Sequence, residues 1–311
     1  MIPNLSVIIV SYNTREITLA CLRSVYDRTC DIESEVIVVD NASADGSAQA
    51  IAALYPQVKL IINKKNRGFA AANNQGLNIA RGKYTLLLNS DTVVLDGALD
   101  KLLAFAESRP KAGVIGGRTV RPDGTLALNC FEPAGLFNLL ISACALHRLY
   151  PRSRTWGRAR LTYWDYATPR RVPVVAGCFM LVRRAAMTDV GLLDERFFMY
   201  AEEMDWCVRF STAGWEVWYT PDSSIIHYGG MSAAQSPTQM SRTAQSSLIL
   251  FLKKYHKGPY VTLCRAVLLS GLILRMPMRL ARALLYGRDR LGSEIRQQYA
   301  IASLYVGLQR P

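Results

Sequence analysis

The motif Asn89-Ser90-Asp91 places a carboxylate directly after the apolar run of residues 84–88. A buried strand that ends on a carboxylate needs a cation or a hydrogen-bonding partner there, because an unpaired buried charge is strongly unfavourable. The hard oxygens of a carboxylate suit Mg²⁺ or Mn²⁺. Taken alone, Asp91 could equally cap the turn that follows the strand.

A second group of carboxylates, Glu202, Glu203 and Asp205, precedes a predicted helix over residues 206–213. The helix dipole stabilises anions near a helix N-terminus, which is a purely structural explanation of the group. Crowding acts in the opposite direction, because neighbouring carboxylates disfavour each other's ionisation. Crowding can therefore raise one pKa toward the range that is useful for proton abstraction. The group is a candidate general base.

The elements that must position these residues are strands that alternate with helices. Apolar and β-branched runs over residues 5–11, 36–39, 58–62 and 84–88 predict four strands, and helices are predicted over 49–54 and 68–80. Such an alternation implies parallel crossovers, with ligands beyond the carboxyl ends of the strands. Asp40 and Asp91 are expected at such ends. Farther along, residues 174–182 predict a strand that contains Gly177, and residues 118–124 predict a hairpin.

Five segments carry motifs that occur together: residues 6–13 (SVIIVSYN), 38–47 (VVDNASADGS), 66–76 (NRGFAAANNQG), 88–91 (LNSD) and 197–205 (FFMYAEEMD). In this order they resemble the nucleotide-sugar glycosyltransferases of family 2, especially the rhamnosyltransferase-like members. The resemblance covers residues 5–232. It implies a GT-A fold of the α/β class, Rossmann-like, with a mostly parallel central sheet flanked by helices.

The resemblance implies a nucleotide-sugar donor and a set of site residues for it. Asp91 would bind Mg²⁺ or Mn²⁺, and the late histidine His227 would complete the metal shell, although a hydrogen-bonded structural histidine is an equal alternative. Asp40 would contact the base or ribose. The donor-binding residues implied are Tyr12, Asn13, Asp40, Asn66, Gly68, Asn73, Asn89 and Ser90.

The chain departs from the Asp-x-Asp pattern of the family, because Asn89 brings no charge to the first acidic place. A single carboxylate holds a cation loosely, so the phosphates of the substrate would have to supply further ligands.

Transfer from a sugar nucleotide requires a base for the acceptor hydroxyl and a cation that neutralises the diphosphate leaving group. The catalytic carboxylate of the family corresponds to Glu203, the second of the acidic pair, where many members have Asp. Glu202 and Asp205 are the alternatives. Direct attack on the anomeric carbon would invert the linkage relative to the donor. The resemblance makes dTDP-rhamnose the leading donor.

Positive charge is concentrated at the C-terminal end of the chain. Twelve of the 37 basic residues but only two of the 24 acidic residues follow residue 241, and the net charge is +13. We therefore divide the chain into a GT-A domain, residues 1–240, and a basic amphipathic helical region, residues 241–311. The apolar window 266–274 is too short to span a bilayer, which needs about 20 apolar residues.

Apolar clusters in this helical region alternate with arginines, namely Arg265, Arg275, Arg279, Arg282 and Arg288. This spacing suits helices that lie in a membrane interface, with basic side chains reaching anionic headgroups. The acceptor would then be a lipid-linked glycan of cell-surface polysaccharide synthesis. The enzyme would be peripheral on the cytoplasmic face of the inner membrane. A second patch, residues 136–160, could help to hold the acceptor. Alternatively, the C-terminal helices pack on the catalytic domain or form a homodimer.

Other features bear on compartment and class. The seven cysteines are scattered without a Cys-x-x-Cys pair, which favours reduced thiols over zinc binding. The first predicted strand begins at residue 5, so we expect no signal peptide and a cytosolic enzyme. Nucleic-acid binding is disfavoured, because no helix-turn-helix, zinc-ligand spacing or RNA-reading aromatic motif accompanies the basic charge.

Two alternative functions follow from the same sequence. A sugar nucleotidylyltransferase has a related sheet but would carry a Gly-rich signature with a Lys after the first strand, and residues 11–14 lack one. A membrane-associated nucleotide-sugar sensor or inactive scaffold is suggested by Asn89. Donor turnover separates transfer from mere binding.

Overall fold

The computed structural model describes residues 3–29, 32–231, 236–285 and 288–307, and the chain forms two compact units. The first unit comprises Met1–Phe131, Asp165–Phe198 and Glu202–Gln235, and the second comprises Glu132–Trp164, Met199–Ala201 and Ser236–Pro311. The second unit thus includes a segment from the middle of the chain, which a division at residue 240 assigns to the GT-A domain.

The first unit is an α/β domain built on one sheet. Among the described residues, nine strands form this sheet in the order β3-β2-β1-β4-β10-β6-β11-β5, with β8 paired to β11. Its strands are β1 (Leu5–Ser11), β2 (Ser34–Asp40), β3 (Lys59–Ile62), β4 (Tyr84–Asn89), β5 (Thr92–Val94), β6 (Ala112–Val120), β8 (Arg170–Arg171), β10 (Phe179–Arg183) and β11 (Glu216–His227). Its helices are α1 (Arg15–Asp27), α2 (Ser47–Leu54), α3 (Phe69–Ile79), α4 (Ala98–Glu107), α7 (Arg184–Val190) and α8 (Glu202–Thr212). The predicted Rossmann-like sheet flanked by helices is confirmed.

The strands β1 to β4 form the parallel half of the sheet. β1 pairs in parallel with β2 and β4, and β2 pairs in parallel with β3. The register aligns Ser11 with Asp40 and Val10 with Asn89. The carboxyl ends of these strands therefore meet at one edge, as predicted, and the four predicted strands are confirmed to within about two residues at each end.

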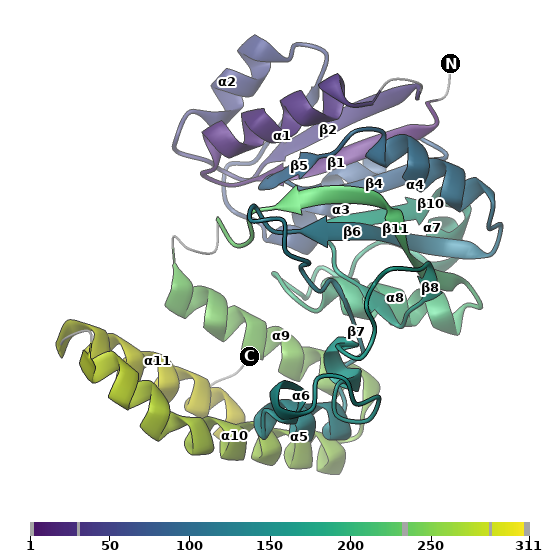
Figure 1. The fold of residues 1–311 in the computed structure, drawn as a ribbon. Coiled ribbons are helices and arrows are strands. Elements are labelled where there is room, and N and C mark those ends of the chain that lie inside the picture. Colours follow the sequence, from purple (N-terminus) through teal and green to yellow (C-terminus); the bar gives the residue numbers. More distant parts are fainter. Residues whose placement is uncertain (1–2, 30–31, 232–235, 286–287, 308–311) are drawn as a thin grey trace. The chain divides into compact units, whose positions relative to one another are not determined.

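Helices cover both faces of this half of the sheet (Figure 1). On one face, Leu22 of α1 and Leu102 of α4 share a buried cluster with Ile9 of β1. On the other face, α3 approaches so closely that a Cβ at Gly76 would lie 2.7 Å from the Ile8 side chain. Odd and even residues of β1 thus face different helices, as the twofold period of a strand requires.

The later strands differ from the predicted pattern. The predicted strand 174–182 is two strands: β9 (Val174–Val175) pairs with β7 (Cys130–Phe131), whereas β10 lies antiparallel between β4 and β6. Gly177 lies between them. An apolar run cannot reveal this interruption, because its periodicity does not mark a change of partner. The hairpin predicted at residues 118–124 is confirmed by a bridge between Val120 and Leu126.

A buried asparagine joins α3 to the loop that follows α7. Asn74 is 3% exposed, and its Nδ2 donates to the Leu193 carbonyl at 2.9 Å and to Glu195 at 3.0 Å. Its Oδ1 accepts from the Leu193 amide at 3.1 Å. The loop precedes α8, so this contact helps to fix the helix that carries the acidic group.

Asn74→Ala should lower the free energy of unfolding by about 2–3 kcal/mol, because both backbone groups of Leu193 would lose a buried partner. Asn78→Ala is the matched control, since Asn78 is exposed on the same helix, and it should change stability by less than about 0.5 kcal/mol. Urea denaturation measures both. Equal midpoints for the two variants would contradict a bracing role for Asn74.

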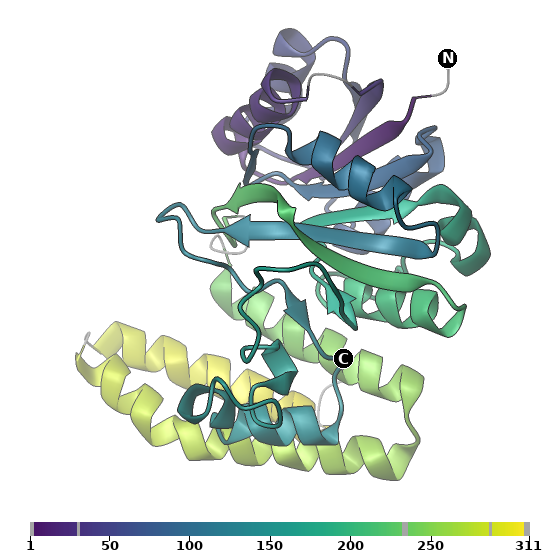
Figure 2. The ribbon, with the colours of Figure 1, turned by 45° about the vertical axis from the view of Figure 1, so that its right-hand side comes forward.

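The second unit is helical. It contains α5 (Leu136–Ala143), α6 (Leu146–Leu149), the short 3₁₀ helix η1 (Arg158–Arg160), α9 (Pro237–Tyr255), α10 (Gly258–Leu285) and α11 (Arg288–Val306). Figure 2 shows α10 and α11 side by side. Leu139 of α5, Leu252 of α9 and Val261 of α10 share one buried cluster, and Ile301 of α11 belongs to a second one with Ile249 of α9. The predicted helical appendage is a packed bundle with its own core.

The arginines of α10 correct one part of the interfacial prediction, namely that their side chains reach anionic headgroups. Arg265 and Arg275 donate to backbone carbonyls at 2.7–2.9 Å, and Arg279 pairs with a glutamate of α11 at 3.4 Å. These three side chains bind within the helical unit and do not reach outward to headgroups. The side chains of Arg282 and Arg288 lie outside the described residues.

The apolar stretch of α10 is longer than the window 266–274 that the sequence indicates. By length and composition alone, Gly258–Ala281 could cross a membrane. The prediction that the apolar stretch is limited to residues 266–274 is wrong. It treats Arg265 and Arg275 as the ends of the stretch, whereas the helix continues past both.

The described cysteines are free thiols. They are Cys21, Cys130, Cys144, Cys178, Cys207 and Cys264, and Cys144 alone among these six is exposed. Cys30 lies outside the described residues.

Candidate functional site

Asp91 lies just after β4 and contacts the last residue of β11. It is 6% exposed, its Oδ1 lies 3.1 Å from Nε2 of His227, and its Oδ2 accepts from the Met231 amide at 3.3 Å. The antiparallel pairing of β11 with β5 aligns His227 with Thr92. The fold therefore brings together two residues that are 136 positions apart in the chain.

The contact between Asp91 and His227 perturbs both groups. Burial alone raises the pKa of the Asp91 carboxyl, but the hydrogen bond to His227 and its charge bring that pKa below its usual value. Burial lowers the pKa of His227, yet hydrogen bonds to Asp91 and to the Cys178 side chain raise it to about 10. Both shifts favour a carboxylate beside an imidazolium.

Asn89 adds an oxygen to this pair but no charge. Its Nδ2 lies 3.4 Å from Nε2 of His227, whereas its Oδ1 is buried and has no hydrogen-bond partner. A buried polar atom without a partner is unfavourable unless a ligand reaches it.

Asp91 and Asn89 could hold a divalent cation through a carboxylate and an amide oxygen, which are ligands that Mn²⁺ or Mg²⁺ accepts. His227 could join them only as a neutral imidazole, so the cation would have to displace its proton. Within the described part of the chain, no group of three or more His, Cys, Asp and Glu side chains could hold a metal ion by itself. A cation here would need further ligands from the phosphates of a bound donor, as the sequence predicts.

The acidic group occupies the first turn of α8, which begins at Glu202 rather than at residue 206. Asp205 is fully buried and its Oδ2 accepts from Arg209 Nε at 2.9 Å. Arg209 also donates to the carbonyls of Val190 and Leu192, at 3.0 and 2.7 Å. Asp205 therefore helps to anchor the loop before α8, which is a structural role.

Glu202 and Glu203 differ in their surroundings. Glu202 is 4% exposed, and burial, followed by the charge of Glu203, raises its pKa well above the usual value. Glu203 is half-buried, and its Cβ lies 3.7 Å from the place that a Cβ at Gly177 would take. The protonated form is thus favoured for Glu202, and Glu203 is the more accessible carboxylate.

Two residues between β9 and β10 connect Glu203 to the pair at the strand ends. Gly177 faces Glu203, and the Cys178 carbonyl accepts from the Asn89 amide at 3.0 Å. The Cys178 side chain also lies close enough to His227 to raise the pKa of that residue. Glu203 and His227 therefore flank the same short stretch of backbone. The sequence places Gly177 inside a predicted strand, and nothing in the pattern indicates Cys178.

Asp40 ends β2 and is 1% exposed. Its Oδ1 accepts from the Ser43 amide at 2.9 Å, whereas its Oδ2 is buried without a hydrogen-bond partner. An N–H group of a base or a ribose hydroxyl would satisfy this oxygen. The predicted role of Asp40 is compatible with this geometry and stays a prediction.

Three further predicted donor residues lie in loops at the same edge. Tyr12 is half-buried after β1, and the side chain of its neighbour Asn13 accepts from the Ala44 amide at 2.7 Å. Ser90 is buried, with its hydroxyl 3.3 Å from that of Thr14. These bonds tie together the loops that follow β1, β2 and β4.

Asn41 organises the loop that contains Asn66 and Gly68. Its Nδ2 donates to the Asn66 side chain at 2.9 Å and to the Gly68 carbonyl at 3.2 Å, and its Oδ1 accepts from Asn63 at 3.0 Å. Asn73 is buried and donates to the carbonyl one turn earlier in α3. The sequence gives no sign of the central place of Asn41, because the contacts join separate loops.

Gly68 combines a left-handed backbone with a close contact. Its φ is +83°, and a Cβ would lie 2.3 Å from the Phe198 carbonyl oxygen, which accepts from the Phe69 amide at 2.6 Å. Any side chain at position 68 would push the loop that contains Asn66 and Gly68 away from the segment before α8.

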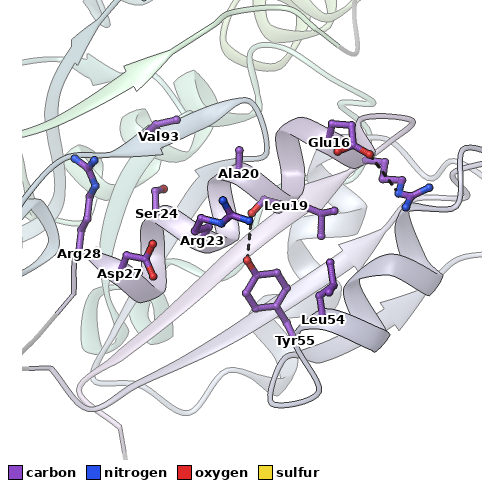
Figure 3. A pocket seen from close by; sticks show the side chains of 11 residues that line it. Glu16, Leu19, Ala20, Arg23, Ser24, Asp27, Arg28, Leu54, Tyr55 and Val93 are labelled. Atoms are coloured by element: carbon purple, nitrogen blue, oxygen red, sulfur yellow. Dashed lines mark hydrogen bonds and ion pairs between the residues drawn. The ribbon is translucent and has the colours of Figure 1, made fainter.

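Two hollows of the first unit lie beside α1. One, of ≈ 560 Å³, is lined chiefly by α1 with Leu54, Tyr55 and Val93, and Tyr55 donates to the Leu19 carbonyl at 3.4 Å (Figure 3). It contains none of the predicted site residues. The other, of ≈ 590 Å³, borders Arg15 and the Ser43–Ala44 loop that follows Asp40.

Comparisons with known proteins agree with the fold. Residues 6–191 match the model of Glycosyl transferase family 2. Over 268 residues the chain is 30% identical to the N-acetylglucosaminyl-diphospho-decaprenol L-rhamnosyltransferase of Mycobacterium tuberculosis, covering 82% of this chain and 86% of that protein.

Two solved structures are similar in fold. The mannosyltransferase PcManGT from Pyrobaculum calidifontis, in complex with GDP-Man and Mn²⁺, has a TM-score of 0.59 and 17% identity, over 98% of this chain and 87% of that one. GalNAc-T7 with UDP, GalNAc and Mn²⁺ has a TM-score of 0.57 and 16% identity, over 81% and 48%. The fold is that of a GT-A glycosyltransferase. The chain belongs to Glycosyl transferase family 2.

Asp91→Asn should weaken Mn²⁺-dependent binding of a nucleoside diphosphate about tenfold or more, because the amide removes the charge that would hold the cation. The fold should persist, since loss of the Asp91 charge lowers the pKa of His227 and an amide can hydrogen-bond to the neutral ring. Titration calorimetry with and without Mn²⁺ measures the effect. Asp96→Asn is the control, because the Asp96 side chain is 90% exposed. An Mn²⁺ dependence unchanged by Asp91→Asn would rule out this residue as the metal ligand.

Proposed function

We propose that the chain is a metal-dependent, inverting glycosyltransferase that moves rhamnose from dTDP-rhamnose to a hydroxyl of a lipid-linked glycan. The family supports glycosyl transfer. The name of the mycobacterial relative supports rhamnose as the sugar and a polyprenyl-linked N-acetylglucosamine as the kind of acceptor. The place of action would be the cytoplasmic face of the inner membrane, in the synthesis of cell-surface polysaccharide.

The observation that carries this proposal is the backbone stretch Gly177–Cys178. Glu203 lies on its Gly177 side, and His227 and Asn89 contact Cys178. A base and an anion-binding centre must lie on opposite sides of the reacting carbon in a single displacement. Residues that flank one short stretch of backbone are close enough for one bound sugar to lie between them.

In the proposed reaction, Asp40 and the loops after β1 and β2 hold the nucleoside. Asp91, His227 and Asn89 face the diphosphate, where a bound divalent cation would neutralise the charge of the leaving group. Glu203 accepts the proton of the acceptor hydroxyl as its oxygen attacks the anomeric carbon. The bond to the diphosphate breaks on the opposite face, so the configuration is inverted.

Glu202 assists this arrangement without acting as a base. Because burial favours its protonated form, it adds little negative charge beside Glu203 and does not compete for the acceptor proton. Two ionised carboxylates at one buried place would repel each other strongly.

The acceptor would reach the enzyme at a membrane. In the second unit, the segment that follows α5 exposes Arg148, Arg152, Arg154 and Arg160. Guanidinium groups bind phosphate through paired hydrogen bonds, so this segment could contact a lipid headgroup or the diphosphate of the acceptor.

Glu203→Gln should lower kcat for rhamnose transfer by about 10²–10⁴-fold, because the amide cannot accept the proton. Donor affinity should stay nearly unchanged, since the proposed role of Glu203 is toward the acceptor hydroxyl. Transfer of labelled rhamnose from dTDP-rhamnose to a polyprenyl-diphosphate-linked N-acetylglucosamine measures the rate.

Glu202→Gln is the control for this experiment, because it replaces the neighbouring carboxylate by a neutral group that resembles its protonated form. It should retain most of the activity. A Glu203→Gln rate close to that of the unmodified chain would move the base elsewhere. If the chain transfers sugar from another sugar nucleotide but not from dTDP-rhamnose, the proposed donor is wrong and the proposed mechanism still stands.

A further inference from the structure

One face of α10 is exposed and carries no charge. Between Gly258 and Ala281, where every side chain of the helix is described, each exposed residue is uncharged. The exposed positions recur every three or four residues and include Leu263, Ala266, Ser270, Ile273, Leu274 and Met278. This spacing places them on one side of the helix. We call these six residues the outer face of α10.

The outer face exposes large apolar side chains over its whole length. Leu263 is 50% exposed, Ile273 and Met278 are 57% exposed, and Leu274 is 68% exposed. The helix of a soluble protein normally presents charged and polar residues on its solvent side. A contiguous apolar face of this kind is typical of an interaction site.

The side chains of Arg265 and Arg275 are directed away from the outer face. Arg265 donates to the carbonyls of Tyr305 and Leu304, at 2.7 and 2.9 Å, and Arg275 donates to that of Ser142 at 2.9 Å. Both arginines serve the contact of α10 with its neighbouring helices. Their charges therefore do not help to solvate the outer face.

We infer that the outer face of α10 lies in the apolar boundary of a lipid bilayer, with the helix parallel to the membrane plane. A crossing orientation would put Arg265 and Arg275 into hydrocarbon together with the polar groups that they bind, which is unfavourable. An in-plane helix buries only the outer face and leaves the inner face packed in the bundle. This inference deepens the proposed action on a lipid-linked acceptor and rests on it for its biological purpose.

A second copy of the chain fits the outer face less well than a membrane does. Basic residues Arg148, Arg152 and Arg154 are exposed in the same unit, as are Lys253 in the last turn of α9 and Lys257 just after that helix. In a twofold dimer this excess of positive charge would be doubled within one assembly. Anionic headgroups would instead attract it.

The test is flotation of the full chain with lipid vesicles in the absence of donor and acceptor. Ile273→Glu combined with Leu274→Glu should reduce binding to phosphatidylcholine and phosphatidylglycerol vesicles about tenfold or more, because two exposed apolar residues become charged. Leu54→Glu combined with Ile62→Glu is the matched control, since these residues of the first unit are 63% and 62% exposed. This control should bind vesicles like the unmodified chain.

The composition of the vesicles separates apolar insertion from charge attraction. Apolar insertion predicts that the unmodified chain still binds neutral phosphatidylcholine vesicles at high salt. Binding that needs phosphatidylglycerol and disappears at high salt would overturn the inference, as would unchanged binding of the Ile273→Glu, Leu274→Glu variant. The unmodified chain could instead be dimeric by light scattering and fail to bind vesicles, with the variant monomeric. That result would show that a second copy covers the face.

Two further measurements keep the result interpretable. Leu263→Gln combined with Met278→Gln alters the same face without adding charge and should also weaken vesicle binding. The test therefore remains possible if the Ile273→Glu, Leu274→Glu variant does not fold. Both face variants should keep Mn²⁺-dependent nucleoside diphosphate binding. Vesicle binding by a chain that transfers no sugar would contradict the proposed function but not this inference.

Discussion

The contact between Asp91 and His227 joins the end of β4 to the end of β11, and the arrangement of the site depends on it. A buried pair of this kind adds little net stability, because desolvation offsets the attraction, yet removal of one partner is strongly destabilising. Its importance is positional. It holds the Asp91 carboxylate, which is 6% exposed, beside the His227 ring, and the Asn89 amide nitrogen lies 3.4 Å from the same ring. The Cys178 carbonyl accepts from the Asn89 amide, and the Cys178 side chain lies close to His227. These contacts bring the start of β10 to the Asp91–His227 pair.

Some of the buried polar atoms without a hydrogen-bond partner belong to residues of the proposed site, and others lie elsewhere in the described part of the chain. Those of the proposed site include Oδ2 of Asp40, Oδ1 of Asn89 and Oε2 of Glu202. Most buried polar groups in proteins are bonded, so such atoms in an otherwise apolar core point to ligands or to protonation. The loops around these atoms are held by many hydrogen bonds, and the Asn41 side chain alone bonds to four other residues. The site therefore combines a fixed frame with atoms left for a substrate.

The parallel strands, the strand-end positions of Asp40 and Asp91, and the family could be predicted from local patterns of the sequence. Contacts between distant segments could not. The i,i+4 spacing of Asp205 and Arg209 on a helix is a local pattern that allows their ion pair. No spacing rule shows that Arg209 also anchors the loop before α8, or that the run 174–182 changes partner at Gly177. The tail shows the same limit, because composition reveals its arginines but not that Arg265 and Arg275 turn inward to backbone carbonyls.

The most direct test of the central claim is a crystal structure of the chain with Mn²⁺ and an intact, non-transferable analogue of dTDP-rhamnose. We expect the ion within about 2.0–2.3 Å of an Asp91 oxygen and of His227, with the diphosphate completing its shell. The Glu203 carboxylate should face the anomeric carbon from the side opposite the diphosphate. An ion bound away from Asp91, or Glu203 on the same side as the leaving group, would contradict the account.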